Sequence, residues 1–499
     1  MELLANLGGG FVQAMSPANL FYCFVGVSVG TFVGVLPGIG SMIGISILLP
    51  LTFYLSPDAA LVMLAGIYYG GEYGGSISSI LINLPGSASS AVTSLDGYQM
   101  TLKGHAPVAL FITAIASFIG GSIGIVLLAA FSPALAHMSL SFGPADYFSV
   151  MVLGLIASTT MSQGAVIKSC AAVVLGVLLG TVGTDINTGI QRFTFGSMDL
   201  FDGISVIVIA MGMFGISEIA ASVLQSEHKA ISARVRLRDM LPTRADVKTS
   251  VMPILRGGFL GSILGALPAT GPTIASFLAY SLEKKVSKHP EKFGTGIIEG
   301  VTAPEAANNA AAQTAFVPTL TLGIPGSATM ALILGALMIH GIPPGPKLMV
   351  ENANLFWALV ASFWIGNLML LVLNIPLVGL WVRLLNIPYR LLYPSIICLI
   401  CVGVYSIKLA SFDVLVVLGV GLLGYAMRLV NMSGAPLLMG FILGPMMEEY
   451  FRRALLLSRG DLTVFVTEPI SATVILVTVF LLIWSGWRSR RANARRRPT

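Results

Sequence analysis

The stretch from Glu299 to Ser327 combines residue types that rarely occur together in a hydrophobic chain. It holds two glutamates, Glu299 and Glu305, the adjacent amides Asn308 and Asn309, and three prolines. Broken, polar backbone at membrane depth survives only where protein buries it or where it lines a wet cavity. Membrane transporters commonly build their substrate sites from such interrupted segments. The stretch therefore predicts a path for a polar solute through a membrane.

Two Pro-Gly-Ser turns offer chemistry suited to binding an anionic carboxylate. Helix N-termini supply free N–H groups and a positive dipole end, which can replace the water that the anion loses. In each turn proline starts a helix, glycine lets a ligand approach the backbone, and serine adds a hydroxyl donor. Structural capping of helix ends is the alternative role, and the two asparagines could equally hydrogen-bond broken backbone. The predicted carboxylate-binding residues, with the two turns expected to face each other, are Asn83, Pro85, Gly86, Ser87, Asn308, Asn309, Pro325, Gly326 and Ser327.

Two glutamates and two Leu-Pro breaks are candidates for binding a coupling ion. An ionisable residue inside a membrane is a functional candidate by default, and carbonyl oxygens freed by unwound backbone coordinate Na⁺ in transporters. For the glutamates, helix-end capping or interfacial exposure is the alternative. The predicted cation-coupling residues are Gly38, Gly40, Ser41, Glu72, Thr270, Gly271, Thr273 and Glu305. We expect Na⁺ or H⁺ as the coupling ion, no cofactor, and no metal beyond a possible Na⁺.

Asp185 and Arg192 lie in a Gly- and Thr-rich turn between two apolar runs. The sequence leaves two roles open for them: a gate or partner contact, or a local ion pair at the membrane interface. Enzyme chemistry is not indicated, because the five histidines lack a paired carboxylate motif and no phosphate-binding G-x-x-x-x-G-K-[ST] motif occurs.

The elements that must position these residues are membrane helices. The chain has 499 residues, of which 55% are hydrophobic and only 10% charged, whereas soluble domains carry about 25% charged residues. Near-continuous apolar runs approach the roughly 20 residues that cross a hydrocarbon core. The net charge of +6 comes from basic loops and a basic tail, so it indicates topology rather than nucleic-acid binding. The sequence predicts an all-α polytopic membrane protein with roughly 10–12 membrane segments.

Three short motifs recur in the same order in the two halves. LPGIG at 36–40 matches LPATG at 267–271, and PGSAS at 85–89 matches PGSAT at 325–329. Glu72 is paired with Glu305, since they lie 35 and 37 residues after the prolines of the two Leu-Pro motifs. On this pairing the second copy has seven extra residues between the acid and the Pro-Gly-Ser turn. The alternative is coincidence among Gly- and Pro-rich membrane segments.

Basic residues predict that the two repeats have opposite orientations. The region from 225 to 256 carries seven Lys and Arg residues and the last twelve residues carry six arginines, so both should be cytoplasmic. The N-terminus has no Lys or Arg before Lys103 and is placed outside. The loop 283–292 holds four lysines and its partner loop 50–58 holds none, which agrees with re-entrant hairpins or broken helices in an inverted pair. Arg452, Arg453 and Arg459 would lie outside and count against this topology.

The predicted organisation has five parts. They are a first repeat at 1–225 running from outside to inside, a basic cytoplasmic linker at 226–256, a second, inverted repeat at 257–463, a closing C-terminal transmembrane helix at 464–487 and an Arg-rich cytoplasmic tail at 488–499.

Five motifs in order give the chain a family resemblance: LPGIG, YGGEYGGS with NLPGS, GTD…TG…RFTFG, EGVTAPEAANN with LTLGIPGS, and LGPMMEEYFRRALLLSRGD. Over about residues 15–465 the chain resembles the large membrane subunit of the tripartite tricarboxylate transporters. The resemblance implies a secondary transporter of the bacterial inner membrane, coupled to Na⁺ or H⁺, that imports small di- or tricarboxylates such as citrate. It also implies two partners, a small integral-membrane subunit and a periplasmic solute-binding protein. An uncoupled channel or a scaffold subunit is the alternative function.

Overall fold

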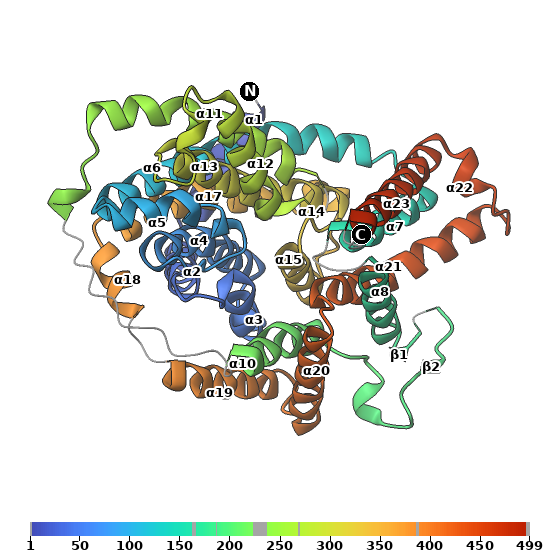
Figure 1. Ribbon diagram of the computed structural model, residues 1–499. Coiled ribbons are helices and arrows are strands. Elements are labelled where there is room, and N and C mark those ends of the chain that lie inside the picture. Colours follow the sequence, from blue (N-terminus) through green and yellow to red (C-terminus); the bar gives the residue numbers. More distant parts are fainter. Residues whose placement is uncertain are drawn as a thin grey trace.

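A computed structural model describes residues 2–161, 166–185, 187–222, 237–267, 270–385 and 389–495. The described chain is almost entirely helical, with one two-stranded antiparallel hairpin that projects from the helices (Figure 1). The elements before the central linker are α1 (Glu2–Ala14), α2 (Pro17–Val35), α3 (Gly40–Thr52), α4 (Pro57–Ile82), η1 (Ser89–Ala91), α5 (Ser94–Leu102), α6 (Ala106–Ser139), α7 (Pro144–Met161), α8 (Val166–Gly180), β1 (Gly183–Thr184), β2 (Gln191–Arg192), η2 (Met198–Leu200), α9 (Val206–Ala210), the π-helix η3 (Met211–Ile216) and α10 (Ser217–Ser222).

The second part of the chain repeats the pattern of long helices joined by short breaks. Its elements are η4 (Leu237–Met240), α11 (Arg244–Gly265), α12 (Gly271–Val286), η5 (Pro290–Lys292), α13 (Glu299–Thr314), α14 (Phe316–Leu322), α15 (Ala328–Ile339), α16 (Pro346–Glu351), α17 (Ala353–Asn374), α18 (Val378–Leu384), α19 (Tyr389–Lys408), α20 (Ser411–Leu429), α21 (Gly434–Leu457), α22 (Val464–Thr467) and α23 (Pro469–Arg495).

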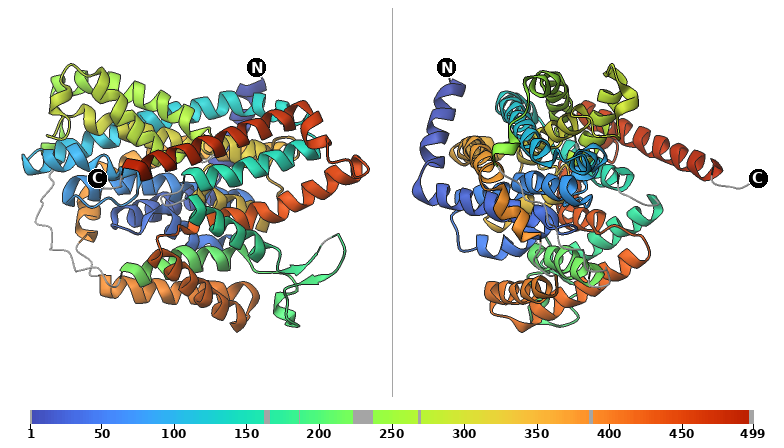
Figure 2. Two further views of the ribbon diagram at one scale, coloured as in Figure 1. Left: turned by 45° about the vertical axis from the view of Figure 1, so that its right-hand side comes forward. Right: turned by 60° about the vertical axis from the view of Figure 1, so that its left-hand side comes forward.

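Four helices are long and apolar enough to cross a membrane: Pro17–Val35, Ala106–Met138, Ala353–Asn374 and Ser411–Leu429. Seven shorter apolar helices accompany them within the described residues. Helical membrane architecture is thus confirmed at this level, and the number of crossings stays a prediction. Figure 2 shows α19 and α20 lying together along one side of the bundle, with the hairpin of β1 and β2 projecting near them.

Glycines set the closest helix contacts in both halves. A Cβ added to Gly26, Gly30 or Gly34 of α2 would lie 2.3–2.5 Å from a backbone oxygen of α4, and one added to Gly257, Gly261 or Gly265 of α11 would lie 2.2–2.4 Å from a backbone oxygen of α13. Real Cβ atoms essentially never approach within 3.0 Å. Small residues spaced by four therefore let each pair of backbones touch, as in closely packed membrane helices. The two halves use the same device.

These contacts correct the predicted pairing of the two glutamates. Gly34 faces Gly71, and Gly265 faces Ala311, so Gly71 and Ala311 are equivalent positions. The prolines of the two Pro-Gly-Ser turns each follow them by 14 residues. Glu72 therefore corresponds to Ala312, and the prediction that it matches Glu305 is wrong. The extra residues of the second copy lie in the longer connection between α12 and α13, not between the acid and the turn.

Helices continue across two of the predicted boundaries. A capping box, in which Thr243 and Asp246 bond each other's backbone N–H groups, starts α11 at Arg244, so residues 244–256 of the predicted linker are helical. Residues 226–236 of that linker lie outside the described residues, as do Pro268 and Ala269 of the second Leu-Pro motif. At the other end, α23 continues past the predicted boundary at residue 487 to Arg495.

Elements of the two halves pack against one another. Helix α13 lies between α11 and α6, where a Cβ on Gly120 of α6 would meet the Ala306 carbonyl at 2.2 Å. Helix α12 contacts η1, and α3 contacts α15, so the helix after each Leu-Pro break touches the segment that follows the other half's Pro-Gly-Ser turn. Helix α21 packs against α8. The candidate site lies where these elements of the two halves contact each other.

Candidate functional site

In the first half, the Leu-Pro break and the Pro-Gly-Ser turn are in contact. Asn83 ends α4 in the left-handed conformation with φ of 59°, and Gly40 begins α3 with φ of 68°. A Cβ on Gly86 would lie 1.7 Å from the Gly34 carbonyl oxygen, and one on Gly40 would lie 3.4 Å from the Gly86 oxygen. Only glycine fits at position 86, because any side chain there would separate the turn from α2.

The second half repeats this arrangement. Helix α14 ends at Gly323 with φ of 72°, and Ser327 starts α15 by accepting a hydrogen bond from the Met330 N–H at 3.2 Å. A Cβ on Gly271 would lie 3.8 Å from the Ser327 Cβ and 3.9 Å from the Gly326 oxygen. Ser327 is therefore a helix cap, the structural role that the sequence left open. A role in carboxylate binding stays a prediction.

The two buried glutamates converge on the segment that follows the first Pro-Gly-Ser turn. Ser89 donates to the Glu72 carboxylate, and Thr93 donates to Glu305 Oε1 at 2.5 Å. Ser117 of α6 also donates to Glu305, at 3.4 Å. Glu72 comes from α4 in the first half and Glu305 from α13 in the second, so this short segment joins two acids from opposite halves.

Ser87 connects the turn to the same network. Its hydroxyl lies 2.8 Å from the Ser89 hydroxyl and 3.2 Å from the Ser90 hydroxyl, and its backbone N–H donates to Ser90 Oγ at 3.3 Å. A change at the turn can therefore reach Glu72 through two hydroxyl groups. Asn83 is exposed and makes no such link in the described structure.

No basic side chain neutralises either acid within the described residues. Glu72 is 4% exposed and Glu305 is fully buried. An unpaired buried carboxylate loses its hydration without a compensating charge, which is strongly unfavourable. The hydroxyl donors of Ser89, Thr93 and Ser117 offset this cost only in part.

Helix α13 carries further polar groups beside Glu305. Asn309 Nδ2 donates to Asn308 Oδ1 at 2.7 Å and to the Glu305 carbonyl at 3.1 Å. Asn308 Nδ2, Asn309 Oδ1 and Gln313 Oε1 are buried and have no hydrogen-bond partner within 3.5 Å among the described residues. Asn309 thus hydrogen-bonds a backbone carbonyl, which is the alternative role that the sequence left open. The unpartnered amide atoms could still hydrogen-bond a ligand.

The remaining cation candidates split between the two Leu-Pro breaks. Gly38 is exposed with φ of 79°, while Ser41 is buried and would be touched at 2.6 Å by a Cβ on Gly71. The Thr270 hydroxyl donates to the Leu267 carbonyl at 2.9 Å, which occupies one oxygen freed by the break. Thr273 is the third residue of α12. Each Leu-Pro break lies beside the Pro-Gly-Ser turn of its own half.

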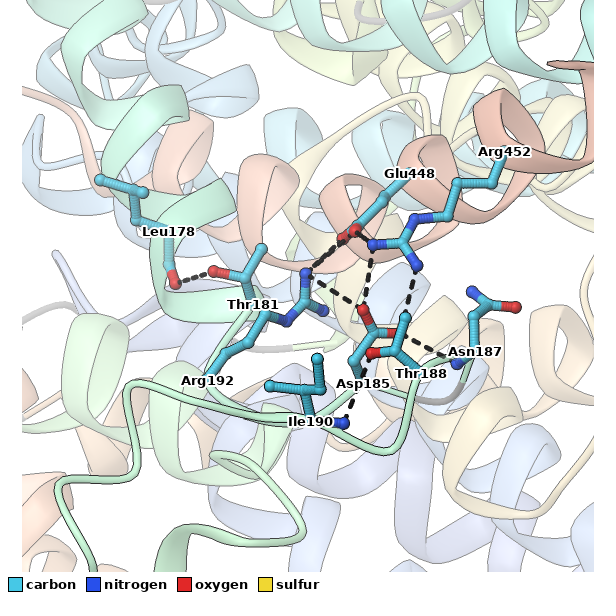
Figure 3. Close-up of polar contacts among 9 residues, drawn as sticks. All are labelled: Leu178, Thr181, Asp185, Asn187, Thr188, Ile190, Arg192, Glu448 and Arg452. Atoms are coloured by element: carbon cyan, nitrogen blue, oxygen red, sulfur yellow. Dashed lines mark hydrogen bonds and ion pairs between the residues drawn. The ribbon is translucent and has the colours of Figure 1, made fainter. Parts of the chain in front are cut away.

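Asp185 and Arg192 belong to a four-residue ion network (Figure 3). Their direct contact is long, at 3.9 Å. Arg192 instead lies 2.9 Å from Glu448, and Arg452 lies 2.9 Å from Asp185 and 2.6 Å from Glu448. The Asn187 N–H and the Arg452 guanidinium hold the pKa of Asp185 below its usual value. The network fastens the hairpin of β1 and β2 to α21 in the second half.

Sequence comparison identifies the family. The profile of the tripartite tricarboxylate transporter TctA family matches residues 20–439. The chain belongs to the TctA family. Family membership makes it a transporter subunit of a tripartite system, in agreement with its apolar helices.

Two relatives of this TctA chain come from Agrobacterium vitis. One, an uncharacterized 52.8 kDa protein in the TAR-I ttuC' 3' region, is 50% identical over 494 residues, which cover 98% of each chain. The other, an uncharacterized protein in the TAR-II ttuC' 3' region, is 53% identical over 234 residues, covering 46% of this chain and 97% of the relative. No solved structure matches the chain.

Asp96 is one of the buried acids of the TctA chain that sequence reasoning missed. Its carboxylate accepts hydrogen bonds from the N–H groups of Gly294, Gly296 and Ile297 at 2.7–3.0 Å and from the Tyr280 hydroxyl at 2.9 Å. It therefore fixes the loop that enters α13 to helix α5. Two features of the sequence could have indicated Asp96. It lies eleven residues after Pro85 of the first Pro-Gly-Ser turn, and it is the only acid between Glu72 and Asp146.

Neither the cavities nor a search for metal-binding groups extends the predicted site within the described residues. Two cavities, of about 10 Å³ and about 170 Å³, contain none of the predicted site residues. Within the described residues no group of three or more His, Cys, Asp or Glu side chains is placed to hold a metal ion.

Proposed function

We propose that this TctA chain carries small di- or tricarboxylates, such as citrate, into a bacterial cell in symport with Na⁺ or H⁺. A periplasmic binding protein delivers the substrate, and a small integral-membrane subunit completes the complex. The chain lies in the inner membrane with its N-terminus periplasmic and its C-terminus cytoplasmic. Its two repeats are inverted with respect to each other.

The observation that carries this proposal is the meeting of Glu72 and Glu305 at the segment beside a Pro-Gly-Ser turn. A carboxylate bound at that turn would be repelled by both acids if they were charged. Two unit charges 4 Å apart interact by about 4 kcal/mol at an effective dielectric constant of ~20. Neutralising the acids with protons or Na⁺ removes this repulsion. Substrate and cation therefore favour each other's binding, which is the thermodynamic requirement for symport.

Repeat geometry supports the inverted arrangement. The glycine contacts of α2 with α4 and of α11 with α13 share one register, and each is followed by a Leu-Pro break and a Pro-Gly-Ser turn. The loop 283–292 is rich in lysine and the loop 50–58 has none. The positive-inside rule therefore favours the cytoplasmic side for the first loop and the outside for the second. Inverted repeats with interrupted helices are the usual frame of alternating access.

Uptake of labelled citrate tests the proposal in cells that express this chain with its two partner subunits. We expect uptake that saturates, requires the binding protein and collapses when the Na⁺ and proton gradients are both dissipated. Flux that persists without either gradient would favour the alternative, an uncoupled channel. A complex that assembles but moves none of a panel of di- and tricarboxylates would favour a scaffold role.

A further inference from the structure

A cavity of about 10 Å³ lies between α4, α6 and α17. Three aliphatic side chains complete its wall, and its polar lining consists of Tyr73, Ser76, Thr113 and Asn374. Its volume is at the lower limit for one water molecule, so it accommodates one small ligand only. Tyr73 directly follows Glu72 on α4, which places the cavity beside the network of buried acids.

Two oxygens in this lining lack a partner. Thr113 Oγ1 and Asn374 Oδ1 accept and donate no hydrogen bond among the residues that the structure describes. Their residues are 3% and 4% exposed, so bulk water does not solvate them. Buried polar atoms are nearly always paired, and two orphans lining one small cavity point to a ligand that they share.

The oxygens of the lining keep more free lone pairs than the lining keeps free hydrogens. The Asn374 amide is oriented by donation from Nδ2 to the Leu370 carbonyl at 2.9 Å, which leaves Oδ1 as an acceptor. The Tyr73 hydroxyl already donates to Asn367 Oδ1 at 2.6 Å, and the Ser76 hydroxyl donates to the Tyr73 carbonyl at 2.7 Å. The Thr113 hydroxyl hydrogen and the second Asn374 Nδ2 hydrogen have no acceptor among the described residues. Neutral oxygens with unspent lone pairs are the ligand set that hard cations prefer.

We propose that this cavity binds one dehydrated Na⁺, with Thr113 and Asn374 as ligands and the Tyr73 and Ser76 oxygens beside them. The inference rests on the proposed cation-coupled transport and names both the ion and a site for it outside the Leu-Pro breaks. Because three helices from both halves enclose the cavity, a bound Na⁺ would hold α4, α6 and α17 together. The small volume favours Na⁺ over K⁺.

Equilibrium binding of ²²Na⁺ to the purified full-length chain tests the site without substrate or partner subunits. Wild-type protein should bind Na⁺ saturably, and excess unlabelled Na⁺ but not K⁺ should compete. Thr113→Val removes one oxygen at nearly constant shape and should weaken binding roughly ten- to a hundredfold. Asn374→Asp adds a negative charge and should tighten binding at neutral pH. Thr113→Ser keeps the hydroxyl and should bind nearly as wild type does.

Thr478→Val is the matched control. Thr478 is a buried threonine whose hydroxyl bonds within its own helix, to the Val474 carbonyl at 2.8 Å, so its loss should leave Na⁺ binding unchanged. No saturable binding by wild-type protein would overturn the proposal and leave a water in the cavity. Unchanged affinity in both Thr113→Val and Asn374→Asp would overturn the location. Normal Na⁺ binding with uptake that ignores Na⁺ would instead refute Na⁺ coupling and leave the site standing.

Discussion

Replacing Gly261 by alanine should weaken the second half of the molecule even though alanine is the better helix former. The new Cβ would lie 2.2 Å from the Ala307 oxygen and 2.6 Å from its Cα. Relief requires a separation of at least 3.0 Å, and both partners are backbone, so neither can rotate away. Helix α11 must therefore move off α13, which also loosens the contacts at Gly257 and Gly265.

The magnitude follows from two opposing effects. Glycine to alanine in a helix gains about 1 kcal/mol from conformational preference. Overpacking a close contact typically costs ~1–3 kcal/mol, and a clash between rigid backbones belongs at the upper end. We expect a net loss of about 2 kcal/mol. Gly9→Ala in α1 is the control, because a Cβ there meets nothing within 4 Å and only the gain remains.

Thermal unfolding of the purified variants in detergent measures both effects. The melting temperature should fall for Gly261→Ala and stay level or rise for Gly9→Ala. Gly30→Ala, whose Cβ would lie 2.5 Å from the Ile67 oxygen, should behave as Gly261→Ala does, since the halves share the device. Equal stability of Gly261→Ala and Gly9→Ala would refute the close approach of α11 and α13.

The sequence predicts the broken helices well because their signals are local. Pro and Gly at Leu-Pro breaks and Pro-Gly-Ser turns interrupt hydrogen bonding wherever they occur. The matching of Glu72 with Glu305 failed because shared residue type was used to align the halves. The alignment of the two halves depends on which backbone atoms the glycines of α2 and α11 contact. A single sequence does not show these contacts.

Polar partners were missed for a similar reason. Thr93 bonds Glu305 across 212 residues, and Arg452 bonds Asp185 across 267 residues. No spacing rule connects such positions. The capping box at Thr243 was readable, since Thr-x-x-Asp is a local signature, and it would have placed the start of α11 correctly.

Three further predictions concern the site and the topology. Ser87→Leu fills the turn and removes the hydroxyl that contacts Ser89. This variant and Ser327→Leu should abolish uptake while membrane insertion stays normal. Normal uptake by both variants would refute substrate binding at the Pro-Gly-Ser turns. The lowered pKa of Asp185 means that its ionised form is favoured by folding, so its stabilisation is complete above its ordinary value of 3.8 and is lost as pH falls through the lower folded-state value. Asp185→Asn should therefore flatten the acid limb of a melting-temperature profile; an unaltered limb would count against the network. Single cysteines should label from the cytoplasm in the loop 284–292 and from outside in the loop 50–58, whereas labelling from one side would exclude inverted repeats.

The most direct test of the central claim compares citrate exchange with citrate accumulation in proteoliposomes that contain the assembled complex. We expect Glu72→Gln and Glu305→Gln to retain exchange of internal for external citrate, because a neutral side chain removes the repulsion of the substrate. Accumulation driven by an imposed cation gradient should be lost, while Glu291→Gln, at an exposed position, keeps both activities. Full gradient-driven accumulation by both Glu72→Gln and Glu305→Gln would contradict the account, because the two buried acids would then play no part in coupling.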